Sequence, residues 1–443
     1  MLKQQARLPK DDARGMEIVN SRLIQVPQSK CPVPLSRFAS LLPTDGILYF
    51  NRKVGTLIEN GYDIKNLGIG QLNYDTPENV RNAMKLALDG GKSGYNDPSG
   101  IIRAKETAAK FIERTRGIPT TAENIIITSG GKPGIPIFIL LATDPGDGVL
   151  YPVPGFPGYY GTISPHGRVP IEYYLKPENN FQPDVGEIER KIVESIERAV
   201  NGIGRVKAII LNGPSNPTGM MYEYGMLKAI ARLAVKYGVR ILSDEVYSLI
   251  NYGKKFLSIA EFEEALYYTT LIESGSKSIP GPGYRFGFMV SWDPGFIAAD
   301  KTYMQSHDSC IMALSQYGLI EGFGGNMDFT KMMVRDLKER RDLAFQMLNG
   351  INGFKCNYLP DGAFYFYVDV GGAVKNLGLK DSDGLATLLL MNGVAALPHY
   401  LFGKQEEGDE RQYMRFSYSV GKEDIEEGLR RVKNVAEGRP TLG

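Results

Sequence analysis

The chain has 443 residues, of which 43% are hydrophobic and 23% charged, and its formal net charge is +1. This length predicts two or three domains. The balanced charge does not indicate binding to nucleic acid or to an anionic membrane. Three histidines and three widely spaced cysteines form no zinc motif or disulfide framework, and no Gly-x-Ser-x-Gly hydrolase motif occurs, so we expect no metal site.

The first residues of the chain, 1–7, are polar and lack the apolar region of a signal peptide. The longest unbroken apolar run, 137–142, preceded by Ile135 and Pro136, is far shorter than the roughly 20 residues of a membrane span. We therefore expect a cytoplasmic protein without a membrane segment. Residues 1–35 show weak periodicity and are expected to form an arm.

Short β-branched runs alternate with helical stretches such as 224–237 between about residues 100 and 300. The runs that we interpret as buried strands are 124–128, 148–151, 206–211, 239–243 and 268–273. This alternation predicts an α/β domain with a mostly parallel sheet wrapped by helices.

Residues beyond about 325 change in character. Helical patterns over 329–348 and 422–436 flank strand-like segments at 362–368 and 414–418, which predicts a smaller α+β domain. We assign residues 1–35 to the arm, 36–70 and 320–443 to the small domain, and 71–319 to the large domain.

The residues that follow the first two predicted strands are candidates for a ligand site, because open parallel sheets bind ligands beyond the carboxyl ends of their strands. Gly130, Gly131 and Lys132 come after the first strand. Two glycines at a helix start let backbone amides approach a phosphate, although they can equally form a tight turn. A Pro- and Gly-rich loop after the second strand holds Phe156, which either stacks on a flat ring or packs in the core.

The next three strand ends carry polar side chains. Asn216 precedes a proline and either offers its amide to a ligand or forms an Asx turn. Asp244 would need a cation or hydrogen bonds if buried, with a helix N-cap as the alternative. Lys277 lies between serines, eight residues before Arg285; a single loop lysine is usually exposed to solvent, so its interpretation depends on the other strand ends.

In this order and spacing, the residues resemble the class I/II aminotransferase family of fold type I pyridoxal 5′-phosphate (PLP) enzymes, and most closely its aspartate aminotransferase-like members. The resemblance extends from about residue 66 to 437. The motifs that carry it are Asn216-Pro217-Thr218-Gly219, Asp244-Glu245-Val246-Tyr247, Ser274-Gly275-Ser276-Lys277 and Gly283-Tyr284-Arg285. It implies a seven-stranded sheet with helices on both faces.

The resemblance also implies roles for these residues around PLP. Lys277 would form a Schiff base with PLP and move a proton between the substrate Cα and C4′ of PLP, whereas Asp244 would keep the pyridine nitrogen protonated. Asn216 and Tyr247 would bind the phenolic oxygen. The other implied contacts are Phe156 on the ring, Gly130, Gly131, Lys132, Ser274, Ser276 and Arg285 at the phosphate, and Tyr95 at the phosphate of the other subunit of a homodimer.

Substrate contacts follow from the same resemblance. Arg415 would bind the α-carboxylate in a bidentate pair, with Gly70 and Asn216 beside it. Lys132 would either meet the distal carboxylate of an aspartate- or glutamate-type substrate or be an exposed lysine at a helix start.

The predicted reaction is transfer of the amino group of an L-amino acid to a 2-oxo acid. Two alternatives stay open: elimination, 1-aminocyclopropane-1-carboxylate formation or oxidative chemistry on the same scaffold, and a non-catalytic regulator with this fold.

Overall fold

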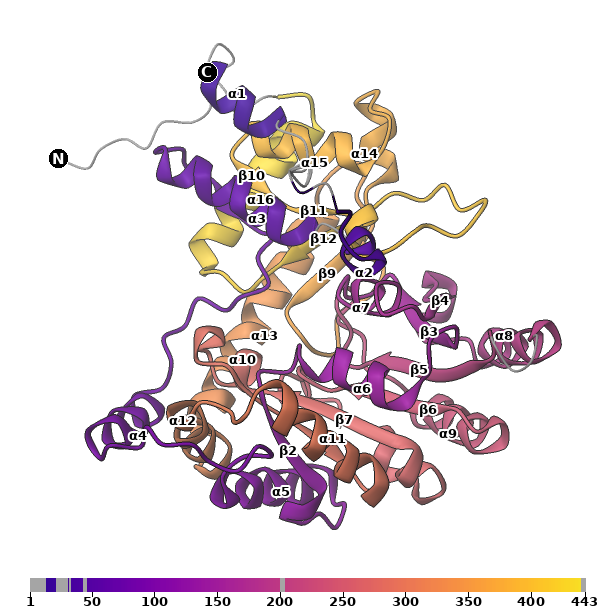
Figure 1. The fold of residues 1–443 in the computed structure, drawn as a ribbon. Coiled ribbons are helices and arrows are strands. Elements are labelled where there is room, and N and C mark those ends of the chain that lie inside the picture. The colour runs from indigo at the N-terminus through magenta and orange to yellow at the C-terminus, as the bar shows by residue number, and fades with distance from the viewer. Residues whose placement is uncertain (1–12, 21–30, 32, 43–45, 200–203, 440–443) are drawn as a thin grey trace.

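A seven-stranded sheet forms the centre of the larger part of the chain (Figure 1). Strand β8 runs antiparallel to its two neighbours, and every other pair in the sheet is parallel. In spatial order the strands are β2 (Ile125–Ser129), β8 (Phe286–Ser291), β7 (Thr269–Ser274), β6 (Arg240–Asp244), β5 (Val206–Asn212), β3 (Gly148–Val153) and β4 (Val169–Tyr174). The computed structural model, which describes residues 13–20, 31, 33–42, 46–199 and 204–439, thus confirms the predicted mostly parallel sheet.

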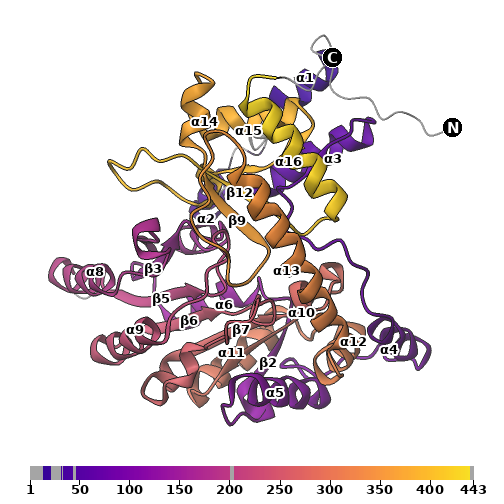
Figure 2. The same cartoon turned by 180° about the vertical axis from the view of Figure 1, so that it is seen from behind.

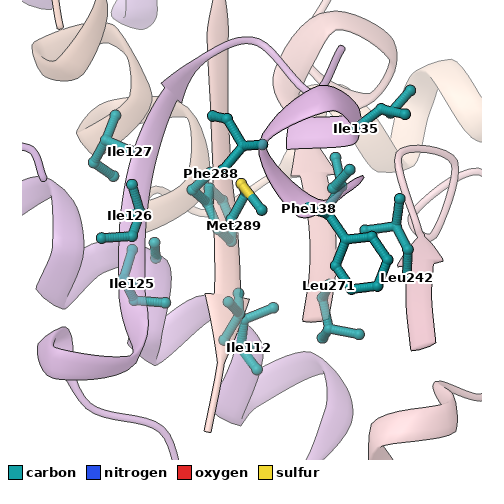
Figure 3. Packing of buried hydrophobic residues seen from close by; sticks show 14 of the residues in the cluster. Ile112, Ile125, Ile126, Ile127, Ile135, Phe138, Leu242, Leu271, Phe288 and Met289 are labelled. Carbon is teal, nitrogen blue, oxygen red and sulfur yellow. The ribbon is translucent and has the colours of Figure 1, made fainter. Parts of the chain in front are cut away.

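The two faces of this sheet are covered by different helices. Phe288 contacts Phe111 of α5 (Ile102–Arg116) and Phe323 of α12 (Ala313–Gly324). The next residue, Met289, instead lies against Gly134 at the start of α6 (Gly134–Ala142). Adjacent strand residues point to opposite faces, so α5 and α12 cover one face and α6 covers the other. Figure 3 shows the apolar packing of β2, β8 and α6.

A smaller antiparallel sheet lies in the C-terminal part of the chain and has the order β11 (Leu397–Pro398), β12 (Tyr413–Ser417) and β9 (Tyr365–Asp369). Helices α13 (Asp328–Asn349) and α16 (Lys422–Ala436) lie beside it in Figure 2. Strand β1 (Lys65–Asn66) pairs in parallel with β10 (Val394–Ala395). An N-terminal segment is therefore tied to the C-terminal part, which confirms the predicted smaller α+β unit.

Eleven further α-helices occur among the described residues. They are α1 (Ala13–Asn20), α2 (Arg37–Leu41), α3 (Gly46–Glu59), α4 (Glu78–Asp89), α7 (Tyr160–Ile163), α8 (Val185–Arg198), α9 (Tyr224–Tyr237), α10 (Gly275–Ser278), α11 (Pro294–His307), α14 (Gly371–Asn376) and α15 (Ser382–Met391). Helices α9 and α16 have the bounds predicted for them, 224–237 and 422–436. Helix α13 extends one residue beyond each end of the predicted helix 329–348.

The domain boundaries stay a prediction. The one between residues 319 and 320 falls within α12, which packs against α4 and α5, so we would move it beyond Gly324. Much of the arm predicted for residues 1–35 lies outside the described residues. Within the described ranges, no helix is long and apolar enough to cross a membrane, and no three His, Cys, Asp or Glu side chains gather as a metal site would need.

Candidate active site

A cavity of about 680 Å³ opens at the carboxyl ends of the central strands, between the large sheet and the smaller one. This is where ligands bind in open α/β sheets. All of the predicted site residues except Gly130 and Tyr95 line it. The chain therefore brings together, from separate strands and loops, predicted site residues that lie as much as 345 positions apart in the sequence (Gly70 to Arg415).

Lys277 lies in α10, the single turn that follows β7, and its amine faces the cavity. Its Nζ donates a hydrogen bond of 2.5 Å to the carbonyl oxygen of Gly70. Burial, and then the nearby guanidinium of Arg415, lower the pKa of the Lys277 amine to about 8, although Asp244 opposes this shift. A large fraction of this amine is therefore neutral, and hence nucleophilic, near pH 8.

Asp244 ends β6 and is buried at the base of the cavity. Its Oδ2 accepts a hydrogen bond of 2.8 Å from the hydroxyl of Tyr159. Burial raises the pKa of the Asp244 carboxyl to about 6, while this hydrogen bond opposes the shift. The carboxylate is thus available for a cationic partner in the cavity. Tyr159 was not predicted, although it lies three residues after Phe156 in the same loop.

Arg415 approaches the cavity from β12 and belongs to the most deeply buried side chains of the chain. Its Nη1 donates to Oδ1 of Asn216 at 2.8 Å, and its Nη2 donates to the carbonyl of Gly68 at 2.7 Å. Its Nε is buried without a hydrogen-bond partner among the described residues. A guanidinium held in this way can bind a carboxylate.

Tyr365, which the sequence analysis missed, lies beside this arginine. The Cζ of Arg415 lies 4.2 Å from the centre of the Tyr365 ring. The hydroxyls of Tyr365 and Tyr247 lie 2.9 Å apart and form a hydrogen bond. Burial raises the pKa of both phenols, so both stay protonated and can donate. One of the two protons is therefore free to face a ligand oxygen.

The end of β2, α10 and the start of β8 form a small polar recess. Gly130 adopts φ +81°, and a Cβ on it would meet the Arg285 guanidinium at 2.5 Å. A Cβ on Gly131 would lie 3.0 Å from Ile272 and Val246. Arg285 donates to the carbonyl of Ser129 at 2.8 Å. Only glycines leave room here for an anion to reach the backbone amides.

Two serine hydroxyls complete this recess. Ser274 and Ser276 have their Oγ atoms 3.0 Å apart, and both line the cavity. With the glycine amides and Arg285 they supply the donors that a phosphate monoester needs, next to the amine and the carboxylate. The residues present therefore fit PLP.

Phe156 forms part of the cavity wall, with its ring 5.6 Å from that of Tyr159 and nearly perpendicular to it. The Nζ of Lys132 lies 5.9 Å from the centre of the Phe156 ring. Both residues line the cavity, as expected if they contact a bound ligand. The cavity thus has an aromatic face with a cation beside it.

Helix α3 forms a wall of the cavity that the sequence analysis did not anticipate. The residues that it contributes are Ile47, Leu48, Asn51, Val54, Gly55 and Ile58. Tyr95 lies elsewhere, on the surface, where the residue is 93% exposed. Its loop is fixed by a hydrogen bond of 3.0 Å from Asn96 to the carbonyl of Ile311.

A family model, proteins of known sequence and solved structures are all similar to this chain. The family model described as aminotransferase class I and II matches residues 62–432. A probable aspartate aminotransferase of Methanocaldococcus jannaschii is 34% identical over 85% of this chain and 94% of its own length. An asparagine–oxo-acid transaminase of Streptococcus mutans is 30% identical over 91% and 99%. The structure of Thermus thermophilus aspartate aminotransferase with maleate matches with a TM-score of 0.82 and 28% identity, covering 91% of this chain and all of that one.

Proposed function

The chain belongs to the class I and II aminotransferase family, and from this membership we propose that it binds PLP through Lys277 and transfers the amino group of an acidic L-amino acid to a 2-oxo acid. Aminotransferase activity is the activity of this family, whose members use PLP. The observation that carries the proposal is one shared cavity, which is lined by the amine of Lys277, the carboxylate of Asp244 and the guanidinium of Arg415.

Each part of the cofactor has a matching group in the cavity. The amine of Lys277 would hold it covalently, and Asp244 would pair with its pyridine nitrogen, fixed by the Tyr159 hydroxyl. Asn216 and Tyr247 would bind its phenolic oxygen. The recess of Gly130, Gly131, Lys132, Ser274, Ser276 and Arg285 would hold its phosphate, and Phe156 would cover its ring. When bound, PLP supplies an electron sink that stabilises negative charge at the substrate Cα.

The protein residues then bind the substrate and move its proton. Arg415 would bind the α-carboxylate through its fork, and Asn216 and the backbone of Gly70 would lie beside it. This contact would fix Cα near the Lys277 amine. Because the pKa of that amine is lowered to about 8, it can take a proton from Cα and return it near neutral pH.

The acidic side-chain preference is supported by Lys132, a cation that lines the cavity beside the Phe156 ring. The similar Thermus structure contains maleate, a four-carbon dicarboxylate, and the Methanocaldococcus protein is described as a probable aspartate aminotransferase. Both observations favour a dicarboxylic substrate over a neutral one.

We also propose that the protein forms a homodimer. Tyr95, Met312 and Ile102 are 93%, 59% and 54% exposed, which makes an apolar surface beside the loop that carries Tyr95. A second subunit would cover this surface, and Tyr95 would then reach the phosphate recess of the other subunit.

The test is a panel of amino donors, namely L-aspartate, L-glutamate, L-asparagine and L-alanine, added to the PLP-loaded protein without an acceptor. We expect aspartate and glutamate to convert the cofactor spectrum and release one 2-oxo acid per site, and Lys277→Ala to abolish this. Lys132→Met should weaken the reaction with aspartate more than that with alanine, whereas Lys92→Met, in an exposed loop, should change neither. Ammonia release without an acceptor would contradict transamination and favour a lyase.

A further inference from the structure

A charged cluster lies behind the cavity and is not part of its lining. Arg116, the last residue of α5, donates from Nη2 to Oε2 of Glu245 at 3.1 Å and to Oε2 of Glu273 at 2.6 Å. Its Nε also donates to Glu245 at 3.2 Å. All three side chains are 1% exposed. Three charges are thus removed from water together, which is costly unless every group is hydrogen-bonded.

The carboxylate oxygens of this cluster are all satisfied by donors. Oε1 of Glu245 accepts from the hydroxyls of Ser258 at 2.5 Å and Ser243 at 3.0 Å. Oε2 of Glu273, which Arg116 contacts, also accepts from the Ser248 hydroxyl at 2.7 Å, and Oε1 of Glu273 accepts from the backbone N–H of Ser274 at 3.0 Å. Carboxylates that meet only donors are held ionised. Burial raises the pKa of both glutamic acids, and Arg116 opposes the rise.

The position of the two glutamates ties this cluster to the proposed cofactor site. Glu245 directly follows Asp244 at the end of β6, and Glu273 directly precedes Ser274 in the neighbouring strand β7. Neighbouring residues point in opposite directions, so Asp244 and Ser274 face the cavity and the glutamates do not. Arg116 therefore connects, from behind, the two strand ends that carry the groups for opposite ends of the cofactor.

We propose that Arg116 is a positioning residue: by bonding Glu245 and Glu273 together, it fixes the spacing between Asp244 and Ser274 that the cofactor requires. This inference rests on the proposed function. The planar fork of arginine suits this task because it reaches two carboxylates at once, which the single ammonium of a lysine does less well. The other titratable groups near the cluster are Asp244, whose pKa Glu245 raises, and Lys277, whose charge acts on Asp244 in the opposite sense.

The experiment compares four variants with the wild-type protein. Arg116→Met removes the bridge, and Arg116→Lys keeps the charge with a poorer bridge. Arg116→Met combined with Glu273→Gln removes the bridge but restores the net charge of the cluster. Arg431→Met is the matched control, because Arg431 is equally buried and ion-paired, with Asp63 and Glu427, at a place away from the cavity. The measurements are the dissociation constant of PLP and amide hydrogen exchange of the apoprotein.

We expect the PLP dissociation constant to rise between about 10-fold and 100-fold in Arg116→Met and in the double variant, and by less in Arg116→Lys. Amide exchange should speed up in peptides covering 240–248 and 269–277. Arg431→Met should lower thermal stability and leave both measurements as in the wild type. Wild-type affinity and exchange in the double variant would overturn the inference, because charge balance alone would then explain Arg116. Equal effects of Arg431→Met would overturn it as well.

The two measurements distinguish failure of the proposed function from failure of the role proposed for Arg116. If the wild-type protein does not bind PLP, the proposed function falls, but the exchange measurement on the apoprotein still decides the role of Arg116. Faster exchange confined to the two strand ends supports the bridge, and a uniform change across the chain contradicts it.

Discussion

Arg415 and Asn216 form a hydrogen bond of 2.8 Å, from Nη1 of the guanidinium to Oδ1 of the amide. The arginine is thus held by neutral acceptors while its charge has no carboxylate partner among the described residues. Because a carboxylate adds an opposite charge and can bind both arms of the guanidinium, a substrate carboxylate can replace the contact with Asn216 and release that amide toward the cofactor. Arg415 would then bind the substrate carboxylate, and Asn216 would bind the cofactor.

The first prediction concerns this arginine. Arg415→Lys removes the planar fork, so we expect KM for both the amino acid and the 2-oxo acid to rise at least about 30-fold, roughly 2 kcal/mol. The dissociation constant of PLP should change far less, because Arg415 faces the substrate. Steady-state kinetics and a PLP titration measure the two effects. Arg411→Lys, in the loop before the same strand, is the control; a KM effect of equal size there would argue against a substrate role for Arg415.

The second prediction follows from the lowered pKa of Lys277. Only the neutral amine can attack the aldehyde of PLP, and its pKa is about 8. The rate of covalent attachment to the apoprotein should therefore rise about tenfold per pH unit below pH 8 and level off above it. Borohydride trapping followed by mass spectrometry measures this rate.

A variant of Arg415 tests the cause of the lowered pKa of Lys277. Its guanidinium lowers the pKa of Lys277, so Arg415→Met should move the profile to higher pH. A profile that levels off near pH 10 in the wild-type protein would contradict the buried position of the amine.

The third prediction concerns Tyr159, which donates to Asp244 at 2.8 Å. This bond stabilises the carboxylate, so Tyr159→Phe should raise the pKa of Asp244 above its value of about 6. The ionised carboxylate is the form that pairs with a pyridinium. PLP affinity should therefore increase with pH through about 6 in the wild-type protein, and the midpoint should move to higher pH in the variant. Tyr160→Phe, at a partly exposed neighbour, should leave the midpoint unchanged.

Much of the sheet could be predicted because its inner strands contain short, buried, mostly apolar runs that are rich in β-branched residues. Two strands were not singled out. Strand β4 lies at the edge of the sheet, contains Pro170 and is mostly half-buried, so its composition resembles that of a loop. Strand β8 follows directly after Arg285, which has a φ of +61°, and its start is obscured by the preceding Gly- and Pro-rich segment.

The site residues that could be predicted lie in short motifs at strand ends, where chemistry restricts the residue type. Tyr365 could not be found in this way, because its place beside Arg415 depends on the register of β9 against β12. The wall formed by α3 was also missed. Its apolar residues repeat as in any amphipathic helix, and only the packing of Val54 and Leu57 with Leu390 and Ala395 decides which face reaches the cavity.

The fourth prediction tests whether Tyr95 acts in the other subunit of a dimer. This residue is 93% exposed and does not line the cavity of its own chain, so it can reach a cofactor only across an interface. We expect Tyr95→Ala to weaken PLP binding and Lys277→Ala to abolish activity. In a mixed dimer of these two variants, one site combines the intact Lys277 of one chain with the intact Tyr95 of the other, and the second site lacks both.

Mixing the two inactive or weakened variants, after dissociation and reassembly, should therefore restore about half of the wild-type activity in each mixed dimer. Sedimentation analysis of the wild-type protein checks that a dimer is present at all. The pair Lys277→Ala and Arg415→Lys is the control, because both residues line the same cavity within one chain and no mixed dimer can restore an intact site. If the Tyr95 mixture recovers no more activity than this control, Tyr95 does not act across the interface.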